Sequence, residues 1–185
     1  MLRIACCIDR LSEWIGITVR WFFVIAVVIS AGNAISRRVF DASSNAFIEL
    51  QWYLFAAGVL LGGAYVLLKD AHVRVDFISV RLTTRTNAIL DALAMIVFVV
   101  PFGLMLVWYS WPMFEIAWRT GETSSNAGGL IRWPVLLCLP VGFALFLLQV
   151  GAEIVKRVLV ILGKEELEAA TSADSGHGRK GDSDA

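Results

Sequence analysis

The chain has 185 residues, of which 58% are hydrophobic and 17% are charged, and its mean hydropathy is +0.72. Soluble domains carry about a quarter charged residues, so this composition excludes an ordinary soluble domain and indicates a membrane protein. Sixteen Lys and Arg residues balance sixteen Asp and Glu residues, which leaves no global basic charge for binding nucleic acid.

Four apolar stretches are each long enough to cross a bilayer. Crossing about 30 Å of hydrocarbon takes about 20 helical residues, and lipid favours helices because their backbone groups are satisfied within the segment. A buried soluble helix is an alternative for one such stretch, but not for four in so short a chain. The predicted fold is an all-α integral membrane protein with one four-helix domain, 1–162, and spans at about 14–35, 47–68, 88–108 and 133–154.

The first span contains a charged residue, Arg20. A basic start and small residues near the end of this span are also features of a cleaved signal peptide. Because Arg20 interrupts the apolar run, we expect the segment to be retained. An ionisable side chain at this depth costs at least a few kcal/mol, so Arg20 either forms an intramembrane ion pair with Asp91 or Glu153, or extends to the interface.

The second span begins near Glu49 and carries Gly58 and Gly62, one helical turn apart, followed by Gly63. Glycines at this spacing let helix backbones approach closely, as association in lipid requires. The pattern is common and predicts a packing face without identifying its partner. Glu49 either binds another subunit or lies among headgroups at a helix N-terminus, where an acidic side chain is favourable.

The loop after the second span is the most distinctive polar segment, KDAHVRVDFISVRLTTR. Its arginines, including Arg74, recur on one helical face, which suits a short surface helix on anionic lipid. His72 and Asp76 are compatible with a proton relay and, more commonly, with a local turn contact.

The distribution of Lys and Arg predicts the orientation. With the N-terminus in the cytoplasm and only the remote Arg179 and Lys180 left out, nine of these residues lie inside, and four lie outside: Arg37, Arg38, Arg119 and Arg132. Both termini are therefore expected in the cytoplasm. Residues 163–185 are small, polar and charged, and are expected to form a disordered cytoplasmic tail.

The chain lacks the usual sequence motifs of enzymes and of cofactor-binding proteins. Its three cysteines form no C-x-x-C pair, and His72 and His177 both lie outside the spans, so an electron-transfer subunit would lack intramembrane haem ligands. Nucleotide-binding, zinc-protease and serine-hydrolase motifs are absent, and no cofactor or metal is expected. A membrane enzyme and a small exporter that dimerises through its glycine face are the alternatives. The few polar residues within the spans favour an accessory or scaffold subunit.

Three segments carry a family resemblance: SRRVF after the first span, FIELQWYLFAAGVLLGGAYVLLKDAHVRVDF, and TSSNAGGLIRWPVLLCLPVGFAL. Together with the length and the four spans, they resemble the small membrane subunit (DctQ-like) of the tripartite ATP-independent periplasmic (TRAP) transporters. The resemblance covers roughly residues 12–158.

The resemblance implies a subunit of the bacterial inner membrane that scaffolds a large multi-span subunit. That complex takes up an organic-acid solute with sodium, after a periplasmic binding protein delivers it. The resemblance also implies roles for three sets of residues. A partner-subunit interface would comprise Glu49, Gly58, Gly62 and Gly63. The cytoplasmic loop would be organised by His72, Arg74 and Asp76. From their predicted side of the membrane alone, the outer-loop residues facing the binding protein would be Arg119, Glu122 and Arg132.

Overall fold

The computed structural model describes residues 2–40, 44–69, 84–126 and 129–162. Its helices are α1 (Leu2–Phe40), α2 (Asn45–Leu68), α4 (Thr84–Ala94), α5 (Val100–Thr120) and α6 (Trp133–Ile161). A π-helical turn, η1 (Met95–Val99), joins α4 to α5 without a break. Four helical segments are long and apolar enough to cross a membrane, which confirms the predicted all-α membrane fold.

The helices are longer than the apolar patterns indicated. α1 has 39 residues and spans about 58 Å, nearly twice the hydrocarbon thickness. It begins twelve residues before the predicted first span, because Asp9 and Ser12 find polar partners on α6. The third span extends from α4 through η1 to the end of α5, and α6 continues seven residues beyond the predicted fourth span.

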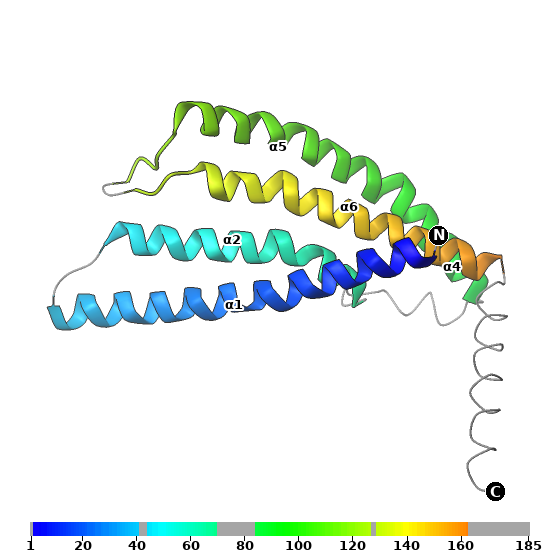
Figure 1. The fold of residues 1–185 in the computed structure, drawn as a ribbon, viewed down its shortest axis with the longest axis horizontal. Coiled ribbons are helices and arrows are strands. Elements are labelled where there is room, and N and C mark those ends of the chain that lie inside the picture. The colour runs from blue at the N-terminus through cyan, green and yellow to red at the C-terminus, as the bar shows by residue number, and fades with distance from the viewer. Residues whose placement is uncertain (1, 41–43, 70–83, 127–128, 163–185) are drawn as a thin grey trace, which may run out of the picture.

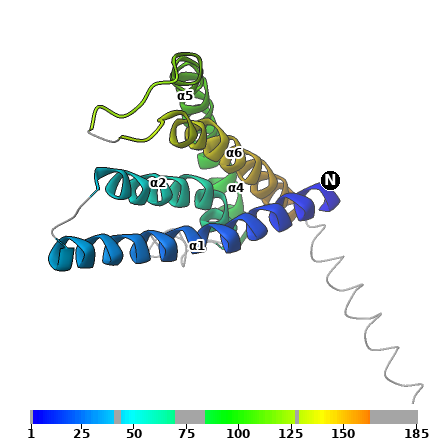
Figure 2. The same cartoon turned by 60° about the vertical axis from the view of Figure 1, so that its left-hand side comes forward.

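The four long segments lie side by side in the order α1, α2, α6 and α5; α1 runs antiparallel to α2, α2 runs parallel to α6, and α6 runs antiparallel to α5 (Figure 1). α1 packs on α2, α2 on α6 and α5 on α6, while α4 packs on the end of α6. The first part of α1 also crosses α6, as the rotated view in Figure 2 shows. The start of α1 and the end of α6 therefore lie at the same end of the row, and the loop between α5 and α6 lies at the other.

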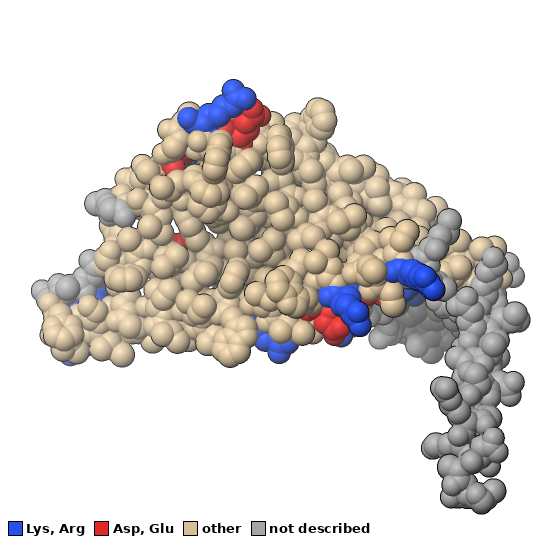
Figure 3. All heavy atoms as spheres, viewed as in Figure 1, with Lys and Arg blue, Asp and Glu red and all other residues tan. Residues whose placement is uncertain are grey.

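Small residues make the contacts between helices. Most of the buried apolar residues are alanines, among them Ala64 and Ala117, whereas many large apolar side chains are exposed. Figure 3 shows a surface with few charged side chains, which stand mostly toward its edges. This is the packing expected in lipid, where close backbone approach holds helices together and large side chains face acyl chains.

Candidate functional site

Polar side chains gather at the two ends of the helix row. At one end, Glu49 meets the loop between α5 and α6; we call its contacts with Ser124, Asn126 and Leu130 the loop clasp. At the other end, α1 meets α6 in the α1–α6 cluster, whose members are Asp9, Ser12, Gln149, Glu153 and Lys156.

The loop between α5 and α6 has a defined backbone conformation. Gly121 ends α5 in the left-handed region, with φ 63°, a conformation that glycine adopts without strain. The backbone N–H of Ser124 then donates to the carbonyl of Leu130 at 2.9 Å. A Cβ on Gly129 would lie 2.7 Å from the carbonyl oxygen of Ser124, so the turn leaves no room for a side chain there.

Glu49 holds this loop against the start of α2. Its carboxylate accepts hydrogen bonds from the Ser124 hydroxyl, from Asn126 Nδ2 at 2.7 Å and from the backbone N–H of Leu130 at 2.8 Å. Glu49 itself is only 8% exposed. The carboxylate is therefore used within the chain, and the contact of Glu49 with a partner subunit stays a prediction.

Two ion pairs flank the loop clasp. Arg132 pairs with Glu122 across the loop, and Arg119 Nη2 lies 2.6 Å from Glu115 Oε1, one turn away on α5. The rings of Trp118 and Trp133 pack edge to face, with centroids 4.6 Å apart. Arg119, Glu122 and Arg132 all keep substantial exposure, and their predicted contact with a binding protein stays a prediction.

The α1–α6 cluster contains the most deeply buried polar contacts in the described part of the chain. Ser12 Oγ donates to Gln149 Oε1 at 2.7 Å, and Gln149 Nε2 donates to Asp9 Oδ1 at 2.8 Å. Gln149 is fully buried and Ser12 is 4% exposed. Lys156 Nζ lies between the carboxylates of Asp9, at 3.2 Å, and Glu153. Every member of the cluster is thus satisfied by another member.

Two further ion pairs tie neighbouring helices at the same end. Lys69, directly after α2, donates to Glu13 of α1 at 2.7 Å, and this hydrogen bond raises the pKa of Lys69. Arg157 of α6 lies 3.1 Å from Asp91 of α4. Charged side chains therefore connect α1 to α2 and α6 to α4 close to the α1–α6 cluster.

The predicted intramembrane ion pair of Arg20 is wrong. Among the described residues, Arg20 pairs with neither Asp91 nor Glu153, because α6 supplies Arg157 to the first and Lys156 to the second. Arg20 is exposed on α1. Its extension to the membrane interface, the other interpretation of the sequence, is compatible with this position.

The predicted glycine interface also packs within the chain. A Cβ on Gly58 would lie 2.7 Å from the ring of Phe23 on α1, while a Cβ on Gly62 or Gly63 would make only ordinary contacts, at 3.6 and 3.8 Å. Gly58 thus packs closely within the chain, and the contact of the three glycines with a partner subunit stays a prediction. A close approach that the sequence analysis missed involves Gly142, where a Cβ would lie 2.7 Å from the carbonyl oxygen of Leu60. No paired glycine spacing marks it.

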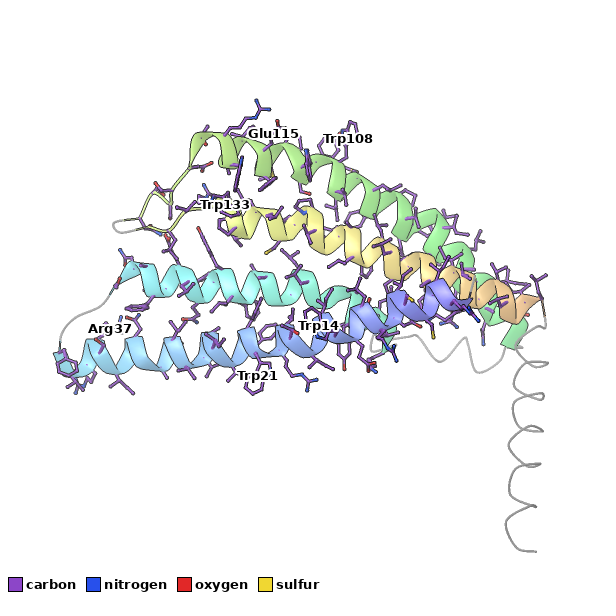
Figure 4. All side chains as sticks on the ribbon, in the orientation of Figure 1. Trp14, Trp21, Arg37, Trp108, Glu115 and Trp133 are labelled. Atoms are coloured by element: carbon purple, nitrogen blue, oxygen red, sulfur yellow. The ribbon has the colours of Figure 1, made fainter. Side chains whose placement is uncertain are left out.

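Large aromatic residues occupy the free sides of the two outer helices. Trp21 points away from α2 and Trp108 points away from α6 in Figure 4, and they are 60% and 77% exposed. The described residues contain no group of three or more His, Cys, Asp or Glu that is arranged to hold a metal. His72, Arg74 and Asp76 of the predicted cytoplasmic loop, and the tail 163–185, lie outside the described residues.

Residues 25–160 match the family model of the DctQ component of the tripartite ATP-independent periplasmic transporters. A search of curated proteins finds no match to the chain. The match includes the loop clasp and the α6 side of the α1–α6 cluster, whereas Asp9, Ser12 and Arg20 lie before it.

Proposed function

Because the chain belongs to the DctQ family, a component of the tripartite ATP-independent periplasmic transporters, we propose that it is the small permease subunit of such a transporter. In this role it scaffolds a large multi-span subunit, which carries the solute and the coupling sodium ions. The solute is an organic acid that a periplasmic binding protein delivers. The chain itself performs no chemistry and binds no cofactor.

The proposal rests on the positions of the buried polar side chains in the helix row. In the described part of the chain, four of the five buried polar side chains are engaged in the loop clasp and the α1–α6 cluster, at opposite ends of the row. The fifth, Ser110, donates to the carbonyl of Val107 in its own helix. Between these ends the contacts are apolar, and at most 28% of the residues in the apolar window of each span are buried. The helices form a row with polar contacts at both ends and apolar free sides. This arrangement suits a scaffold better than a solute pathway, because a solute pathway needs convergent polar groups.

The membrane orientation in this proposal follows the Lys and Arg bias. The α1–α6 cluster lies at the cytoplasmic side of the bacterial inner membrane, and the loop clasp lies at the periplasmic side. The exposed Arg119, Glu122 and Arg132 are then available to the binding protein. Glu49 and the glycines of α2 make contacts within the chain. We therefore place the surface that contacts the large subunit on the apolar free sides of the outer helices, α1 and α5.

Reconstitution tests this function directly. The chain, a large membrane subunit of such a transporter and its binding protein are placed in proteoliposomes with a sodium gradient, and solute uptake is measured with each component left out in turn. We expect uptake only with all three, and co-purification of the large subunit with the tagged chain. Uptake by the chain alone, or undiminished uptake without it, would overturn the proposal.

A further inference from the structure

Arg20 is a charged side chain on the free side of α1. It lies within the apolar helix α1, is exposed, and makes no ion pair with any described residue. The nearest acidic residue along the helix toward its start, Glu13, is already neutralised by Lys69. A charged side chain near hydrocarbon is unfavourable unless an opposite charge or water reaches it. An anion from outside the chain would neutralise Arg20.

An apolar groove runs between α1 and α2 beyond Arg20. It has a volume of about 600 Å³ and is lined mainly by apolar residues, among them Phe23, Val27, Ala31 and Ala34 from α1 and Trp52 and Phe55 from α2. Ser30 and Gln51 also line it. The alanines leave the space that larger side chains would fill. Its size falls within the usual range for ligand pockets.

Arg20 and the groove lie on the same face of α1. Val27, Ala31 and Ala34 follow Arg20 by seven, eleven and fourteen residues, which are positions on one side of a 3.6-residue helix. The groove follows α1 from Phe23 to Ala34, over which the axis rises about 17 Å, compared with about 15 Å for one leaflet of a bilayer with about 30 Å of hydrocarbon. A positive charge at one end of a leaflet-long apolar groove matches the form of a phospholipid.

The tryptophans of α1 place Arg20 near a headgroup region. Trp14 and Trp21 are 66% and 60% exposed and flank Arg20 along the helix, and Figure 4 shows Trp21 directed away from α2. Exposed tryptophans concentrate at the membrane–water interface. An arginine at that level extends its guanidinium toward lipid phosphates, and guanidinium–phosphate pairs form strong, charge-assisted hydrogen bonds.

We propose that Arg20 and the α1–α2 groove form a binding site for an anionic phospholipid. The phosphate of the lipid pairs with the Arg20 guanidinium, and one acyl chain lies along Phe23, Val27, Ala31 and Ala34. The bound lipid fills the space between α1 and α2 and neutralises Arg20. This inference requires only that the chain lies in a bilayer, and it stands apart from the proposed transport role.

Native mass spectrometry of the full-length chain tests the site. The protein is purified from nanodiscs that contain equal amounts of phosphatidylglycerol and phosphatidylcholine, and the retained lipids are counted. We expect one phosphatidylglycerol to be retained preferentially. Arg20→Ala should reduce this preference about tenfold, the loss expected for one charge-assisted hydrogen bond, and Arg20→Lys should restore part of it. Ala31→Leu, which narrows the groove, should reduce retention of both lipids.

Arg38→Ala is the matched control, because Arg38 is an exposed arginine at the other end of the same helix; its lipid retention should equal that of the unmodified chain. Circular dichroism checks that each variant keeps its helices. Equal phosphatidylglycerol preference in Arg20→Ala and the unmodified chain would overturn the proposal. Loss of the co-purified large subunit in Arg20→Ala, with lipid retention unchanged, would overturn it too and assign the groove to a helix of that subunit.

Discussion

The carboxylate of Glu49 accepts a hydrogen bond from the backbone N–H of Leu130, a residue 81 positions further along the chain, at 2.8 Å. Glu49 lies in the first turns of α2, and Leu130 lies in the loop that joins α5 to α6. This contact therefore fastens the second span to the connection between the third and the fourth. It makes the loop part of the helix assembly.

Replacing Glu49 should loosen this loop. Glu49→Ala removes the acceptor for Asn126 and for the Leu130 N–H, and leaving the partly buried N–H of Leu130 without an acceptor is costly. We expect the Leu130 amide to exchange hydrogen at least several-fold faster, and the thermal unfolding midpoint in detergent to fall by a few degrees. Glu49→Gln, which keeps an acceptor oxygen, should have a smaller effect. Glu115→Ala is the control, because Glu115 is exposed and pairs only with Arg119 on its own helix. Unchanged exchange at Leu130 in Glu49→Ala would contradict the loop clasp.

The four spans could be predicted from the sequence, whereas the contacts between them could not. A run of apolar residues is a local signal of a membrane helix, and the predicted spans lie inside the helices observed. Glu49 stood out by its place at the start of a span, but its acceptor role depends on donors 75 to 81 residues away. Asp9 and Ser12 lie in a polar segment before the apolar run, so nothing local marked them as partners of α6.

The buried contact between α1 and α6 should be measurable as a coupling energy. Ser12 and Gln149 share a 2.7 Å hydrogen bond in which both residues are almost fully buried. In a double-mutant cycle of Ser12→Ala and Gln149→Leu, unfolded in mixed micelles, we expect a coupling of about 0.5–1.7 kcal/mol, the range found for hydrogen bonds between membrane helices. Ser12→Ala combined with Ser110→Ala should be additive, since Ser110 bonds only to its own helix, at Val107. Additive losses for Ser12 and Gln149 would count against the hydrogen bond.

A second cycle distinguishes the observed ion pair from the predicted one. Arg157 lies 3.1 Å from Asp91, and both side chains are partly buried. We expect Asp91→Ala and Arg157→Ala to couple by about 0.5–1 kcal/mol, as partly exposed ion pairs do. The cycle of Asp91→Ala with Arg20→Ala should show no coupling, because Arg20 makes no contact with Asp91 in the structure. A larger coupling for Arg20 than for Arg157 would restore the prediction made from the sequence.

The glycines illustrate why a motif alone does not locate a close contact. The Gly58 and Gly62 pair has the expected spacing, yet a Cβ on Gly62 would lie at an ordinary 3.6 Å from Val19. Gly142 has no such partner in sequence, and its neighbour is the backbone of another helix, Leu60 of α2. Side-chain patterns on one helix cannot show which turn of a second helix passes closest, because that depends on the crossing geometry.

Gly142→Ala should therefore destabilise the protein. The added Cβ would lie 2.7 Å from the carbonyl oxygen of Leu60, and because a backbone group cannot rotate away, α2 and α6 must separate. We expect a loss of about 1–3 kcal/mol in the free energy of unfolding in mixed micelles, typical of overpacking. Gly151→Ala is the matched control on the same helix, since its Cβ would meet nothing within 4 Å; its stability should be unchanged or raised by up to about 1 kcal/mol through helix propensity. If the two variants were equally stable, the close approach of α2 and α6 at Gly142 would be refuted.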